Sequence, residues 1–220
     1  MDDMHVDIRA KNPSLDSSRI KDYPLLQGKE VMLRATLEDG TVGECFTDNP
    51  LPFSGSLKEL LLEREGEIPC LIATLNAVMR KRGFIDKTSH CNGRTPEKCA
   101  ELLLDYIEVL GYDKIGLIGF QPAFVCKLQE TFKNLMVSDL STENIGKKDC
   151  VEILNGNEYN KKIIQSSDVI LVTGSTIANG TFEDILELAI KFNKRVIFYG
   201  TTIAGVSALL GVERFCPMSE

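Results

Sequence analysis

Between residues 114 and 200, short apolar segments alternate with amphipathic ones, and this alternation limits the folds open to the chain. The apolar segments span 114–119, 135–139, 169–173 and 195–200, with helix-like segments at 123–132, 159–165 and 182–192 between them. Near-continuous apolar runs such as Val169-Ile170-Leu171-Val172 are typical of strands buried on both faces. Strands that alternate with helices form parallel sheets through right-handed crossovers. We therefore predict an α/β fold with a Rossmann-like, mostly parallel sheet and helices on both faces.

A small α+β unit is predicted ahead of this sheet. Residues 31–37 alternate between apolar and polar, Asp39-Gly40 can supply the positive φ angles of a tight turn, and 42–46 returns as the partner strand. Helices are expected at 57–64, from Pro69 to about Arg82, and at 95–109. We divide the chain into an N-terminal arm (1–28), an α+β domain (29–93) and the Rossmann-like domain (94–220).

Composition narrows the function classes. The 220 residues include 25 Lys and Arg against 32 Asp and Glu, a net charge of −7 that argues against nucleic-acid binding. Seven cysteines without a CxxC pair indicate a reducing compartment. The start of the chain is acidic and polar, and the longest apolar stretch, 203–212, is far shorter than the ~20 residues of a membrane helix. We expect a cytoplasmic protein with no membrane partner, and a homo-oligomer is compatible with the sequence.

The predicted sheet indicates where a ligand would bind. Open parallel sheets bind ligands beyond the carboxyl ends of their strands, which selects four polar loops at 119–122, 139, 173–181 and 200–202. Asn76, a polar residue in an apolar helix, either bonds locally or reaches the same cleft. The candidate ligand-binding residues are Asn76, Gly119, Gln121, Asp139, Thr173, Gly174, Ser175, Thr176, Asn179, Gly200, Thr201 and Thr202.

Asp139 is the one candidate for catalysis. It follows Gly119 by 20 residues, the position of an acid that accepts hydrogen bonds from a ribose. The alternative is a loop cap that bonds amides near Ser141. The glycine fingerprint is incomplete, since only Gly116 and Gly119 are present. The cofactor stays unknown: a nucleotide, including one like S-adenosylmethionine, and a divalent heavy metal are both possible.

The loop at 173–181 carries hydroxyl and amide side chains that a turn alone does not require. Thr181 and Asp184 have the spacing of a capping box, and one alternative is that the whole loop is a cap and a turn. We favour a loop that faces a ligand, because a cap does not explain the other polar residues clustered before Thr181. No GK[ST] follows, so the loop is not a Walker A motif. The chain has two histidines and no HExxH or GxSxG motif, which argues against a zincin or a serine hydrolase.

One weak metal motif lies in the connector. His90 and Cys91 are adjacent, with Asp86 and Cys99 nearby, and a divalent heavy metal would be the ligand. Their spacing matches no known closed site, so a chance grouping is the alternative.

Residues 168–181 (DVILVTGSTIANGT) resemble the central motif of the putative heavy-metal chelation domain family of bacteria and archaea, as do 114–122 and 200–202. Residues 39–43 and 73–77 resemble the enolase-N-terminal-like domain that precedes it there, so the resemblance covers 29–217. It implies an enolase-N-terminal-like domain packed on a Rossmann-like domain, with a site in the cleft between them. It also implies heavy-metal chelation, with condensation or hydrolysis in making pterin-, flavin- or siderophore-like molecules.

Two functions stay open. The first is a protein that binds a nucleotide-, pterin- or flavin-like molecule in the cleft, with or without catalysing condensation, hydrolysis or group transfer. The second is a non-catalytic protein that binds a heavy metal or a metal chelate. Hydroxyl- and amide-rich loops suit organic ligands better than soft metal ions, which favours the first.

Overall fold

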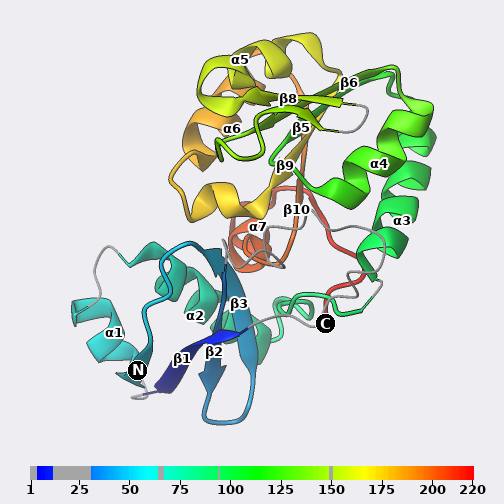
Figure 1. The fold of residues 1–220 in the computed structure, drawn as a ribbon. Helices are drawn as coiled ribbons and strands as arrows, with labels where there is room; N and C mark the ends of the chain where they lie inside the picture. The colour runs from blue at the N-terminus through cyan, green and yellow to red at the C-terminus, as the bar shows by residue number, and fades with distance from the viewer. Residues whose placement is uncertain (1–3, 12–30, 64–66, 94, 149–150) are drawn as a thin grey trace.

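Two β-sheets organise the chain (Figure 1). The computed structural model describes residues 4–11, 31–63, 67–93, 95–148 and 151–220. Within these ranges, one sheet is antiparallel with four strands, and the other is mostly parallel with seven. The prediction of an α/β fold with a mostly parallel sheet is confirmed.

The smaller sheet has the strand order β3-β2-β1-β4 and is covered by α2. The alternation predicted at 31–37 buries Leu33 and Ala35 against Ala73 and Ala77 of α2. The elements of this unit are β1 (His5–Lys11), β2 (Val31–Leu37), β3 (Val42–Thr47), β4 (Phe53–Ser56), α1 (Leu57–Glu63) and α2 (Ile68–Lys81).

The expected N-terminal arm contains a strand. Residues 5–11 form β1, which pairs antiparallel with both β2 and β4 and buries Val6 and Ile8. The remainder of that arm, residues 1–3 and 12–28, lies outside the described residues. The small sheet is therefore wider than the single hairpin that we predicted.

The turn between β2 and β3 differs in detail from the prediction. Gly40 has a φ of +80°, but Asp39 is not among the residues with positive φ. Asp39 Oδ1 instead accepts a hydrogen bond from the Thr41 amide at 3.0 Å. The carboxylate stabilises a turn in which only the glycine takes the left-handed conformation.

The larger sheet has the order β11-β10-β9-β5-β6-β8-β7, and its strands are parallel except for β7 against β8. The strands are β5 (Lys114–Ile118), β6 (Asn134–Asp139), β7 (Gly146–Lys148), β8 (Val151–Asn155), β9 (Val169–Thr173), β10 (Arg195–Tyr199) and β11 (Arg214–Phe215). The helices are α3 (Thr95–Leu110), α4 (Pro122–Thr131), α5 (Gly156–Ser166), α6 (Phe182–Lys191) and α7 (Ala204–Leu210).

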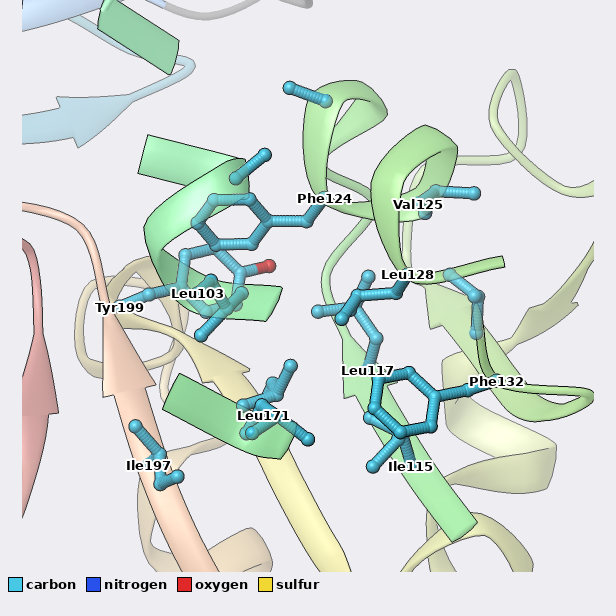
Figure 2. Packing of buried hydrophobic residues seen from close by; sticks show 14 of the residues in the cluster. Leu103, Ile115, Leu117, Phe124, Val125, Leu128, Phe132, Leu171, Ile197 and Tyr199 are labelled. Carbon is cyan, nitrogen blue, oxygen red and sulfur yellow. The ribbon is translucent and has the colours of Figure 1, made fainter. Parts of the chain in front are cut away.

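Helices cover both faces of this sheet. Figure 2 shows the side on which Leu117 and Leu171 pack against Leu103 of α3 and Phe124 of α4. Alternate strand residues, such as Ile170, point to the opposite face and pack with residues of α5 and α6. Figure 1 shows α3 and α4 on one side of the sheet and α5 and α6 on the other. Burial on both faces explains the continuous apolar strands in the sequence.

Four of these strands, β5, β6, β9 and β10, were predicted, whereas β7, β8 and β11 were not. Val151 and Ile153 flank Glu152 in β8, an alternation that could have indicated a strand. The helix after it begins earlier than expected, at Gly156, because Asn155 caps it by accepting a hydrogen bond from the Asn157 amide. Across the part of the chain that the structure describes, no helix is both long and apolar enough to cross a membrane.

Candidate functional site

A cavity of about 820 Å³ lies between the two sheets. One wall is formed by the loops that follow β5, β6, β9 and β10 at their carboxyl ends. The other is formed by Phe46, Thr47 and Asp48 at the end of β3 and by Pro69 of α2. We call this cavity the cleft. Strand β5 lies between β6 and β9, so later strands are added first on one side of β5 and then on its other side. The cleft adjoins this point, where such sheets usually bind their ligands.

Two glycines shape the backbone of the cleft in different ways. Gly119 has a φ of +96°, and a Cβ added there would lie 2.5 Å from Thr173 Cγ2. Its carbonyl also accepts a 2.6 Å hydrogen bond from the Tyr199 hydroxyl, which ties β10 to the end of β5. Gly200 has a φ of +93°, but a Cβ there would meet no heavy atom within 4 Å. Gly119 is thus required by space and conformation, and Gly200 by conformation alone.

Asp139 borders the cleft with both carboxylate oxygens engaged. Oδ2 accepts the Phe120 amide at 2.6 Å, and Oδ1 accepts the Ser141 amide at 2.8 Å. These hydrogen bonds confirm the alternative interpretation of Asp139, in which its carboxylate caps the loop by bonding amides near Ser141. A carboxylate oxygen can accept more than one hydrogen bond, so the half-buried group retains acceptor capacity toward the cleft.

Gln121 also lines the cleft and has a structural role. Its side-chain oxygen accepts the Phe124 amide at 2.6 Å, which caps α4. The N-terminus of that helix follows directly, with Pro122 in its first turn. This cap holds the loop after β5 in place against the cleft.

The loop after β9 is a short 3₁₀ helix, η1 (Gly174–Ile177), held together by its own side chains. The Thr176 hydroxyl donates to the Thr173 carbonyl at 2.8 Å. The expected capping box is not formed, because Thr181 makes no side-chain cap bond to α6. The Thr181 hydroxyl instead donates to Asn179 Oδ1 at 2.7 Å, and the Thr181 amide donates to the same oxygen at 3.1 Å. Asn179 thus shapes the turn that leads into α6.

Thr201 and Thr202 are adjacent and buried but differ in their partners. The Thr202 hydroxyl accepts the Phe46 amide at 3.1 Å and so joins the two sheets. The Thr201 hydroxyl has no hydrogen-bond partner among the residues that the structure describes, although Thr201 is only 1% exposed and lines the cleft. A buried hydroxyl without a partner is costly, so it marks a place where a further polar group is expected.

Asn76 does not line the cleft, contrary to the prediction. It is fully buried, and its Nδ2 lies 2.9 Å from the Glu44 carbonyl, 3.2 Å from that of Thr201 and 3.0 Å from that of Thr202. Its Oδ1 accepts the Gly205 amide at 2.7 Å. The side chain is buried outside the cleft and bonds across to the larger unit, so its role is structural.

The remaining predicted ligand-binding residues come together. The structure places Gly119, Gln121, Asp139, Thr173, Gly174, Ser175, Thr176, Asn179, Gly200, Thr201 and Thr202 on the lining of one cavity. Sequence reasoning missed several parts of this lining, among them Phe46, Asp48, Ser138 and Glu143. Ser138 donates to Asn160 Oδ1 at 2.6 Å, and Asp48 follows β3 in a polar loop that no motif singled out.

His90 and Cys91 also line the cleft, together with Cys99 and Cys216. The His90 Nδ1–H donates to the Cys91 carbonyl at 2.7 Å, and burial lowers the pKa of the His90 ring. Burial raises the pKa of the Cys91 thiol, and raises that of Cys99 to about 12, so both thiols are protonated at neutral pH.

These side chains do not fit a closed heavy-metal site. Among the described residues, no three His, Cys, Asp or Glu side chains are grouped so that they could hold a metal ion. Asp86 is exposed and lies outside the lining of the cleft. His90 and Cys91 are adjacent in the sequence, but no described residue adds the third ligand that a metal site would need.

Fold and cleft together define an α/β protein with a cavity at the carboxyl edge of a mostly parallel sheet. The profile of the DUF364 family, described as "Putative heavy-metal chelation", matches residues 102–211, half of the chain. The chain belongs to this family, as its motifs predicted.

Solved structures agree with this assignment. A DUF364 protein of unknown function from Pyrococcus horikoshii is 20% identical, with a TM-score of 0.57 over 91% of this chain and 73% of its own. Another, from Desulfitobacterium hafniense, is 15% identical, with a TM-score of 0.50 over 82% of this chain and 72% of its own. No curated protein matches the chain. The likeness to an enolase-N-terminal-like domain stays a prediction.

Proposed function

We propose that this protein binds a small organic ligand of nucleotide, pterin or flavin type in the cleft. The observation that carries the proposal is the unpartnered Thr201 hydroxyl, which is buried in the lining of an 820 Å³ cavity. That volume lies within the range of pockets for small molecules and cofactors. A ligand oxygen or nitrogen at Thr201 would supply the missing hydrogen bond.

The strand order supports a Rossmann-like ligand position. Starting from β5, the order β8-β6-β5-β9-β10-β11 is the 3-2-1-4-5-6 order of dinucleotide-binding sheets. Asp139 ends β6, the second strand of that count, where such sheets place an acid on a ribose. The site would serve condensation, hydrolysis or group transfer linked to metal chelation, with Asp139 as the proton-accepting group.

A metal-chelate carrier is the second candidate. Three cysteines, Cys91, Cys99 and Cys216, line the cleft, and cysteine sulfur is a preferred ligand of soft metals. Their grouping does not satisfy a metal on its own. A metal would therefore enter with an organic chelator that supplies further ligands.

A thermal-shift screen of untagged protein tests both candidates. The panel holds S-adenosylmethionine, S-adenosylhomocysteine, NAD, flavins, pterins and divalent metals. A ligand at 100 times its dissociation constant should raise the free energy of unfolding by about 2.7 kcal/mol. Binding in the cleft predicts a shift with an organic compound that Thr201→Val and Asp139→Asn reduce.

The control variant is Asp86→Asn, which removes an exposed carboxylate outside the cleft. It should leave the shift unchanged. Shifts with metals alone, abolished by Cys91→Ser, would replace the organic-ligand proposal with direct metal binding. An organic compound whose shift survives both cleft substitutions would place the site elsewhere.

A further inference from the structure

Negative charge surrounds the cleft. Asp48 reaches it from the smaller unit, and Asp139 and Glu143 reach it from the end of β6 and the loop beyond. All three side chains end in a carboxyl group, and the chain as a whole carries a net charge of −7. They come from both walls, so a ligand seated between the walls lies in their combined field.

The guanidinium of Arg214 bonds backbone carbonyls beside the cleft but does not line it. Arg214 donates from Nε to the Gly200 carbonyl at 2.8 Å and from Nη2 to the Lys87 carbonyl at 2.9 Å. Its guanidinium therefore fastens the loop after β10 and does not line the cavity. Within the described ranges, the lining includes no lysine or arginine. Phosphate groups are normally bound by such side chains or by exposed amides.

The groups that remain for a ligand are neutral or apolar. Thr201 offers an unpartnered hydroxyl, and Asn179 and Ser175 line the same cavity. Phe46 and Phe120 provide aromatic surface on opposite walls. Hydroxyl groups next to aromatic surface suit a flat heterocycle that bears sugar hydroxyls.

We infer that the cleft takes a ribonucleoside-like heterocycle that carries no phosphate and is either uncharged or cationic. This inference rests on the proposed function and narrows it. Asp139 accepts hydrogen bonds from the hydroxyl groups of the sugar, and the Thr201 hydroxyl bonds a nitrogen or oxygen of the ligand. The carboxylates repel the phosphorylated forms of the same compounds. A cationic centre on the ligand is stabilised by the same field.

Matched pairs of compounds that differ only in a phosphate test the inference. Calorimetric titrations of the full chain use adenosine and AMP, riboflavin and FMN, and nicotinamide riboside and its mononucleotide. In every pair that binds, the phosphate-free member should bind at least ~10-fold tighter at low ionic strength. The preference should shrink as salt screens the carboxylates.

Substitutions identify the source of the preference. Asp48→Asn should reduce the ratio of the two affinities about threefold while the phosphate-free member still binds, since one repulsive charge is lost. Asp86→Asn removes a carboxylate outside the cleft and should leave the ratio unchanged. Equal or tighter binding of the phosphorylated members overturns this inference alone. If no pair binds, this inference fails, and the proposed function fails with it only if no organic compound of the thermal-shift panel binds either.

Discussion

The segment Thr201-Thr202 contributes to two regions between the sheets, and its polar groups are hydrogen-bonded in one region but not fully in the other. One region, which we call the seam, comprises Asn76, the Glu44, Thr201 and Thr202 carbonyls and the Gly205 amide, and every group in it is paired. In the cleft, the Thr201 hydroxyl has no hydrogen-bond partner within the described part of the chain. Buried polar groups are nearly always hydrogen-bonded. The comparison teaches that a complete network indicates a structural role, whereas the open position at Thr201 is the observation on which our ligand proposal rests.

The largest expected effect comes from Asn76→Ala. This change leaves the seam carbonyls and the Gly205 amide without their shared partner. We expect the free energy of unfolding in urea to fall by about 4 kcal/mol. Asn157→Ala, on the exposed face of α5, should change it by less than about 0.5 kcal/mol. A small effect at Asn76 would show that the seam does not hold the two units together.

The two glycines of the cleft should respond unequally to alanine. Gly119→Ala places a methyl group against Thr173 at positive φ and should cost about 3 kcal/mol in urea unfolding. Gly200→Ala meets open space and should cost only about 1 kcal/mol, from conformation alone. Equal costs would mean that Gly200 is also confined, so that the cleft does not open beside it.

Valine substitutions at the adjacent residues Thr201 and Thr202 test the comparison of the seam with the cleft directly. Thr202→Val removes the acceptor of the Phe46 amide and should lower the free energy of unfolding by about 1.5 kcal/mol. Thr201→Val removes a hydroxyl that has no partner, and should leave stability unchanged or raise it by about 0.5 kcal/mol. Denaturant unfolding of both variants without added ligand measures the difference. A larger loss at Thr201 would contradict its assignment as an open position.

The smallest effect is a pH dependence at His90. Burial holds its pKa in the folded protein below the 6.5 of a free imidazole, so the unfolded chain takes up the proton first. The free energy of unfolding should therefore decline as pH falls below about 6.5, and this contribution should level off below the folded-state pKa. His90→Gln should reduce the decline between about pH 7 and pH 5.5, measured in urea. An identical decline in both proteins would assign it to other groups.

Sequence patterns predicted the larger unit well because its strands are buried on both faces. The run at 169–173 became β9 with the same bounds, and the helix predicted at 182–192 became α6. The strand β8 was missed because only Ile153 of its five residues is buried, so it has no continuous apolar run like that of β9, and because it adjoins the cap of α5. Strand β1 was missed because its burial depends on partners distant in the chain, β2 and β4.

Site residues were predictable by position but not by role. The rule for strand ends brought eleven of the candidates to one cavity, since topology alone determines which loops meet. It could not show that Asn179 would accept both bonds from Thr181 in place of a capping box. Nor could it place Asn76 in the seam, because that requires the packing of α2 against α7.

The segment formed by Thr201 and Thr202 belongs to both the seam and the cleft, and this links two equilibria. A molecule that bonds the Thr201 hydroxyl also restrains the carbonyls on which Asn76 depends, so ligand binding and docking of the smaller unit stabilise each other. Thermodynamic reciprocity makes the two effects equal in free energy. A substitution that loosens the seam would therefore weaken affinity without touching the ligand, and a bound ligand would protect the seam from local unfolding.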